Sequence, residues 1–170
     1  FNFISKNWIE AQKRINHSLS KEIKIFKTHN VRGIINNNFF TDEHVCKGFI
    51  YLIRDPRDIV ISLSKHMGIS IDESINILLY KKNFVTNVFK VNEAVCTWAQ
   101  HVKSWINFNK VPRLILKYED MIKNNHKIIL YTKEFLEIVH NNSLRINSEV
   151  INKTGINTSF NKLKKLEKKN

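Results

Sequence analysis

The sequence is poor in the residues that break up or cross-link a chain. It has 4 glycines, 2 prolines and 2 cysteines among 170 residues. With so little glycine and proline, no long flexible linker is expected, and the length fits one domain over residues 1–170. Cys46 and Cys96 lie far apart, without the spacing of a metal site, so we predict buried, reduced thiols and no bound metal.

Long hydrophobic runs are missing as well. No stretch approaches the roughly 20 apolar residues of a membrane-spanning helix. Residues 1–10 mix polar and apolar side chains and do not resemble a signal peptide. We therefore predict a cytoplasmic protein without a membrane span.

Acidic residues are few relative to basic ones. The chain has 15 Asp and Glu against 28 Lys and Arg, which gives a net charge of +13. Basic proteins often bind anions such as nucleotides, nucleic acids or sulfated ligands. An AT-rich coding sequence, which enriches Lys, Asn and Ile, produces the same charge, so composition alone leaves both explanations open.

Hydrophobic patterns predict strands that alternate with helices. Strands are expected over 24–28, 48–53 and 113–118, and helices over 8–15, 56–67, 72–83, 91–108, 127–140, 145–153 and 159–169. Asp55 suits the N-cap and Pro56 the first position of the helix that follows the second strand. Strands separated by helices imply an α/β fold with a parallel sheet. Ligands of such sheets bind at the carboxyl ends of the strands.

The first predicted strand ends in a lysine and a histidine. Lys27 and His29 would point to the same side if the strand reaches His29, because side chains alternate along a strand. Histidine can accept a proton near neutral pH, and lysine can stabilise negative charge on a leaving group. The alternative is an ordinary strand-end histidine beside a solvated lysine.

The other predicted strands also end in polar residues. Arg54 follows the second strand, and Ser62 lies in the next helix; a guanidinium and a hydroxyl there suit a phosphate. The alternative is an arginine paired with Asp55 or Asp58. Tyr118 ends the third strand, and its phenol could donate to a ligand oxygen. Close to the C-terminal end, Thr158 and Ser159 could cap the last helix.

Five segments, in this order, resemble the cytosolic-type sulfotransferase family. They are KTH at 27–29, RDPRDIVISLS at 54–64, WAQHVKSW at 98–105, LKYEDM at 116–121 and TSFNKLKKLE at 158–167. The resemblance covers the chain from about Lys24 to its end. It implies a central parallel sheet flanked by helices, related to the P-loop nucleotide kinases.

The resemblance also implies an activity, which is transfer of a sulfuryl group from 3′-phosphoadenosine 5′-phosphosulfate to a hydroxyl or amine of a small-molecule acceptor, without a metal. The product is adenosine 3′,5′-bisphosphate. His29 matches the family's general base, and Lys27 matches the lysine that steadies charge on the leaving nucleotide. Arg54 and Ser62 match the pair that holds the 3′-phosphate. The other residues that match nucleotide contacts are Tyr118, Thr158, Ser159, Phe160 and Leu163, the last four around the adenine.

The sequence departs from the family in places. It contains no TxPKSGTT-type phosphate loop and no late Arg-Lys-Gly segment. We expect both to lie beyond the ends of this chain, so that residues 1–170 form an incomplete sulfotransferase domain. Asn30 follows His29 where relatives often have Leu-Pro.

Three alternatives to an active sulfotransferase remain. One is a catalytically inactive, sulfotransferase-like nucleotide-binding protein. A second is a basic nucleic-acid-binding module based on NKLKKLEKKN at 161–170, although no aromatic platform or recognition helix accompanies those charges. The third is a P-loop kinase relative.

Overall fold

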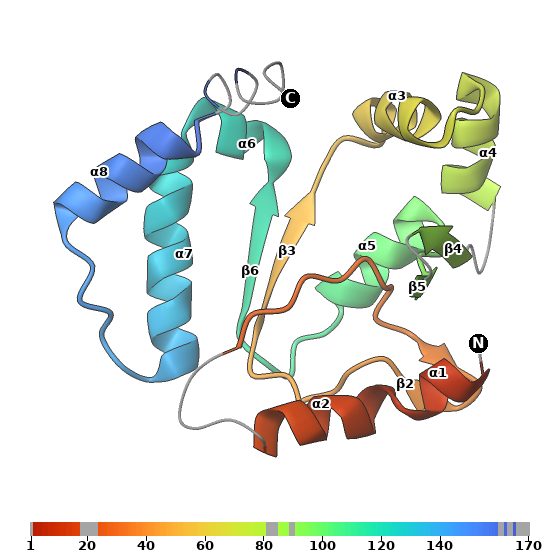
Figure 1. Ribbon diagram of the computed structural model, residues 1–170, viewed down its shortest axis with the longest axis horizontal. Coiled ribbons are helices and arrows are strands. Elements are labelled where there is room, and N and C mark those ends of the chain that lie inside the picture. The colour runs from red at the N-terminus through yellow and green to blue at the C-terminus, as the bar shows by residue number, and fades with distance from the viewer. Residues whose placement is uncertain are drawn as a thin grey trace. The chain divides into compact units, whose positions relative to one another are not determined.

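A computed structural model describes residues 2–17, 24–80, 85–88, 91–159, 162 and 165 (Figure 1). Contacts divide the chain into two compact units. The first unit comprises Phe1–Lys47 and Asp55–Val111, and the second comprises Gly48–Arg54 and Pro112–Asn170.

The first unit is mainly helical with two small hairpin-like sheets. Its elements are α1 (Asn2–Lys6), α2 (Trp8–His17), β1 (Ile34–Ile35), β2 (Asn38–Phe39), α3 (Pro56–Met67), α4 (Ile71–Tyr80), β4 (Val85–Val88), β5 (Val91–Ala94) and α5 (Trp98–Ile106). β1 pairs with β2, and β4 pairs with β5, both antiparallel. The ring of Phe40 meets Trp8 and Trp105 edge to face, at centroid distances of 5.3 and 6.3 Å. These aromatic contacts join α2 and α5 to the segment after β2.

Helix α3 begins where the sequence predicts. Asp55 is its N-cap, and the Asp55 side chain accepts a hydrogen bond from the backbone N–H of Arg57 at 2.9 Å. Pro56 occupies the first helical position, where no backbone N–H is needed. Gly68 ends the helix with φ 65°, a left-handed conformation that glycine adopts without strain.

The helix predicted over 91–108 is wrong in its first part. Val91–Ala94 is instead strand β5, and Cys96 then takes a left-handed φ of 60°. The helix starts only after Thr97, whose hydroxyl accepts from the backbone N–H of Gln100 at 3.2 Å while the Gln100 side chain bonds back to the cap. β-branched valines favour strands, and Thr-x-x-Gln is the signal for a capping box. Both signals were in the sequence and outweigh the apolar periodicity.

Replacing Thr97 by alanine is expected to lower the free energy of unfolding by about 0.5–2 kcal/mol. Thr97 is buried, so the Gln100 N–H would lose its acceptor with little access to water. Urea denaturation of the variant and the wild type measures the change. Thr97→Ser keeps the hydroxyl and should keep most of the stability; an equal loss in both variants would contradict a capping role.

The second unit contains the predicted parallel sheet. β3 (Phe49–Ile53) and β6 (Arg113–Lys117) run parallel, with Ile53 opposite Lys117 at their carboxyl ends. The helices are α6 (Tyr118–Lys123), α7 (Asn125–His140) and α8 (Ser148–Asn157). Figure 1 shows α7 running alongside β6, with α8 packed against α7. An α/β fold with helices against a parallel sheet is therefore confirmed.

Gly48 permits a close approach at the start of this sheet. A Cβ atom there would lie 2.7 Å from Val139 Cγ2 and 3.1 Å from Phe135 Cζ, both on α7. Phe135 is buried, with 7% of its surface exposed. The absence of a side chain at Gly48 thus lets α7 pack directly on the chain as it enters β3.

Other predicted elements need correction. The first predicted strand, 24–28, has no regular secondary structure, because no described strand pairs with it. The helix predicted over 145–153 begins later and runs past Gly155, whose carbonyl accepts from Asn125 Nδ2 at 2.6 Å. The predicted terminal helix lies largely outside the described residues. Cys46 and Cys96 are thiols outside any disulfide, as predicted, but both are half-buried where burial was expected.

Candidate nucleotide and acceptor site

Arg54 and Tyr118 come together at the carboxyl end of the parallel sheet. They directly follow β3 and β6, whose last residues face each other across the ladder. The Arg54 guanidinium carbon lies 4.6 Å from the centroid of the Tyr118 ring, a cation–π contact. Tyr118 was predicted as the last residue of the strand; it is instead the first residue of α6, one position past the end of β6. The sequence thus predicted the neighbourhood of this pair correctly.

The Arg54 side chain has hydrogen-bonding capacity to spare. Its Nε atom is buried and has no hydrogen-bond partner within the described parts of the chain. A buried donor left unpaired costs free energy, and such exceptions call for a specific explanation. A ligand that supplies an acceptor oxygen would remove that cost.

Asp55 does pair with an arginine, but that arginine is Arg57 and not Arg54, which the alternative interpretation had expected. Arg57 contacts Asp55 through Nη2 at 2.5 Å and Nε at 3.0 Å. Hydrogen bonds from Arg57 lower the pKa of Asp55 to about 2, so this carboxylate stays charged and occupied. No ion pair of Arg54 occurs among the described residues.

The predicted adenine segment is described only in part. Thr158 donates through Oγ1 to the Thr154 carbonyl at 2.8 Å, and Ser159 donates through Oγ to the Ile156 carbonyl at 3.0 Å. Both hydroxyls donate back to the end of α8, where the last carbonyls of a helix have no partner within the helix. Whether they also cap the terminal helix stays a prediction, because most of that helix lies outside the described residues. Phe160 and Leu163 lie outside the described residues, and the nucleotide contacts of this segment stay predictions.

Lys27 and His29 lie in the first unit, in a segment that is exposed and irregular. Since 24–28 is not a strand, side-chain alternation gives no reason for the two residues to share a side. Ser62 is exposed on α3, also in the first unit, whereas Arg54 belongs to the second. The pairing of Ser62 with Arg54 at one phosphate therefore stays a prediction.

The chain that follows the candidate base is firmly held. The carbonyl of His29 accepts from His101 Nε2 at 3.2 Å, and the carbonyl of Asn30 accepts from the indole Nε1 of Trp105 at 3.1 Å. Sequence reasoning predicted none of these contacts of Asn30, His101 and Trp105; it noted Asn30 only as a departure that could alter the acceptor pocket. The available signal was the spacing within WAQHVKSW, which puts His101 and Trp105 one turn apart on a helix.

Neither a metal site nor a membrane-spanning helix is found in the described parts of the chain. No group of three or more His, Cys, Asp or Glu side chains there is arranged to hold a metal ion. Within the same ranges, no helix is both long and apolar enough to cross a membrane.

Comparison with known proteins identifies the family. The family model described as the sulfotransferase domain matches residues 5–170, so the chain belongs to the sulfotransferase family. It is 31% identical over 83% of its length to sulfotransferase 1B1 of Canis lupus familiaris, and 28% identical over 76% to 3-beta-hydroxysteroid sulfotransferase of Cavia porcellus. The matched region covers 44% of each relative, so the chain spans less than half of their length.

A solved structure supports the fold. The chain is similar to mouse sulfotransferase SULT7A1, which was crystallised in complex with PAP, with a TM-score of 0.51 and 22% identity. The match covers 68% of this chain and 39% of that one. The family resemblance and the α/β fold expected from the sequence are both confirmed.

Proposed function

We propose that this chain carries the acceptor base and part of the nucleotide site of a sulfotransferase. The reaction is transfer of a sulfuryl group to a hydroxyl or amine of a small acceptor. When bound, 3′-phosphoadenosine 5′-phosphosulfate supplies that sulfuryl group. The observation that carries the proposal is the buried, unpartnered Nε of Arg54 beside Tyr118 at the carboxyl end of the parallel strands. Ligands of α/β sheets bind at this edge.

The residues present fit the chemistry of such a nucleotide. Arg54 offers a permanently charged, forked donor for the 3′-phosphate, and Ser62 would add a hydroxyl. His29 accepts the acceptor's proton, and the ammonium of Lys27 stabilises charge on the leaving group. Like phosphoryl transfer, sulfuryl transfer asks a protein mainly for positioning and charge stabilisation. The proposal includes no metal.

Family membership favours this function over the alternatives. A sulfotransferase domain that matches residues 5–170 leaves little of the chain for a separate nucleic-acid-binding module. The same match separates the chain from the P-loop kinases. An inactive nucleotide-binding protein would bind the nucleotide but would not transfer the sulfuryl group. Transfer needs a general base, and His29 is present to act as one. A cytoplasmic location belongs to the proposal, since the five segments of this chain resemble cytosolic-type sulfotransferases.

Titration calorimetry with the 170-residue chain tests the nucleotide site. Adenosine 3′,5′-bisphosphate is expected to bind roughly 10–150-fold more tightly than adenosine 5′-phosphate, the ratio expected for a charged hydrogen bond of about 1.5–3 kcal/mol. Because the sequence lacks a TxPKSGTT loop, we expect the Kd of adenosine 3′,5′-bisphosphate to lie above about 1 μM. Adenosine 2′,5′-bisphosphate carries the same charge and controls for general attraction to a basic protein. Equal affinity for all three ligands would contradict a 3′-phosphate site.

A further inference from the structure

One face of α5 contacts the backbone of the candidate base and of the residues that follow it. His101, Ser104 and Trp105 share this face, because residues three and four apart are neighbours on a helix. Besides the two bonds to the carbonyls of His29 and Asn30, Ser104 Oγ accepts from the backbone N–H of Arg32 at 3.1 Å. Trp105 is itself buried, with 6% of its surface exposed. A rigid helix thus binds three backbone groups within a four-residue segment.

Strand β5 holds the same segment through Asn30. Asn30 Oδ1 accepts from the backbone N–H of Ala94 at 2.8 Å, and the carbonyl of Ala94 accepts from the N–H of Val31 at 2.6 Å. The Asn30 amide also donates to Thr28 Oγ1 at 3.1 Å, which shapes the chain just before it. A leucine at position 30 could make none of these side-chain bonds. Asn30 therefore ties the chain after His29 to β5 and also contacts Thr28, the residue before His29.

The imidazole of His29 has no such support of its own. It is exposed, and no hydrogen bond from its ring to another described residue occurs. Its location consequently depends on the backbone at residues 29–32. For a general base that dependence matters, because a displacement of about 1 Å can cost on the order of 10²-fold in rate.

We propose that His101 is a positioning residue for His29 and acts through its hydrogen bond to the His29 carbonyl. Trp105 supports it by the bond to the carbonyl of Asn30, the next residue. The functional meaning rests on the proposed role of His29 as the acceptor base. A carbonyl oxygen only accepts, so the His101 ring must carry a proton on Nε2. Burial lowers the pKa of His101, which favours the neutral ring near pH 7. In the neutral ring, the bond to the His29 carbonyl selects the tautomer with its proton on Nε2.

Nuclear magnetic resonance of the 170-residue chain tests the proposal without turnover. In the wild type, a long-range proton–nitrogen spectrum is expected to show His101 as the Nε2–H tautomer at pH 7. The Nδ1–H tautomer would overturn the proposal, since that ring cannot donate to His29. This result needs no variant, so a folding failure cannot mask it.

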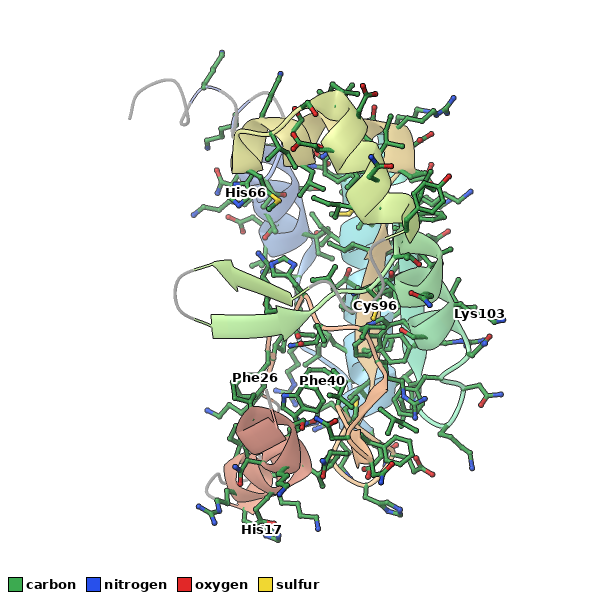
Figure 2. All side chains as sticks on the ribbon, turned by 90° about the vertical axis from the view of Figure 1, so that its right-hand side faces the viewer. His17, Phe26, Phe40, His66, Cys96 and Lys103 are labelled. Atoms are coloured by element: carbon green, nitrogen blue, oxygen red, sulfur yellow. The ribbon has the colours of Figure 1, made fainter. Side chains whose placement is uncertain are left out.

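Backbone order parameters at His29 give the second measurement. They are expected to fall from about 0.85 to below about 0.6 in His101→Leu. His101→Gln, whose amide places a donor near the position of Nε2, should restore the wild-type value. Lys103→Leu is the matched control on the same helix, because Lys103 is exposed on the outer side of α5 (Figure 2).

Two outcomes of that measurement would overturn the proposal. One is an unchanged order parameter at His29 in His101→Leu, and the other is an equal fall in Lys103→Leu. Either would leave the proposed function intact, because the role of His29 in turnover is measured separately, by replacing His29 itself. Loss of turnover in His29→Ala together with an immobile His29 in His101→Leu would thus reject only this inference.

Discussion

Replacing His29 by alanine is expected to lower the rate of sulfuryl transfer by roughly 10²–10⁴-fold. The acceptor must lose its proton as the new sulfur–oxygen or sulfur–nitrogen bond forms, so a base within about 3 Å of that proton is needed. His29 is exposed, and its ring makes no hydrogen bond to another described residue, so its nitrogen is free to meet an acceptor. The affinity for adenosine 3′,5′-bisphosphate should stay close to unchanged, because His29 is assigned no nucleotide contact.

Transfer of radiolabelled sulfuryl groups to a panel of phenols, alcohols and amines measures this effect, in the protein that contains this chain. His44→Ala is the matched control, since His44 is another exposed histidine of the first unit with no assigned role.

The Lys27→Ala variant should also lower turnover, because charge on the leaving nucleotide grows in the transition state. A near-wild-type rate for His29→Ala on a good acceptor would assign the base to another residue.

The parts of the fold that the sequence predicted well are governed by local rules. Asp55 and Pro56 placed the start of α3 through capping chemistry that needs only neighbouring residues. Two apolar runs joined by helices implied a parallel pair, and this pairing alone brings Arg54 next to Tyr118. The rule that polar residues gather at strand ends therefore places Arg54 and Tyr118 correctly, whereas their ligand contacts stay predictions.

The failures arise where tertiary contacts decide. Residues 24–28 have strand-like composition, but a strand exists only when another strand pairs with it, and none does among the described residues. In 91–108 the apolar period of three and four masked a strand and a capping box at Thr97. The bonds from His101 to His29 and from Trp105 to Asn30 join residues 72 and 75 positions apart, a separation that periodicity in one sequence cannot reveal.

The segment around His29 illustrates how these levels combine. Its own residues specify no regular structure, yet Asn30 provides an amide that fits between Ala94 and Thr28. That fit requires β5 to end at Ala94 and α5 to begin after Thr97. The error in predicting 91–108 as one helix and the failure to predict the contacts of Asn30 therefore have the same origin.

Replacing Arg54 by alanine is expected to weaken binding of adenosine 3′,5′-bisphosphate by about 1.5–3 kcal/mol, or roughly 10–150-fold in Kd. The reason is the loss of a charge-assisted donor, Arg54 Nε, that has no hydrogen-bond partner among the residues that the structure describes. Arg54→Lys keeps the charge but not the forked geometry, so its affinity should fall between those of the wild type and the alanine variant.

The choice of ligand separates recognition from structure. For adenosine 5′-phosphate, which lacks the 3′-phosphate, the Arg54→Ala effect should nearly vanish, whereas an equal loss with both ligands would make Arg54 a structural residue.

The stability of the Arg54→Ala variant is the second control. Within the protein Arg54 contributes a cation–π contact with Tyr118, worth about 0.5–2 kcal/mol. Its removal also relieves an unpaired buried donor, which offsets that loss. Urea denaturation should therefore show little net change, and a calorimetric loss confined to the 3′-phosphorylated ligand would then place the phosphate at the carboxyl end of β3.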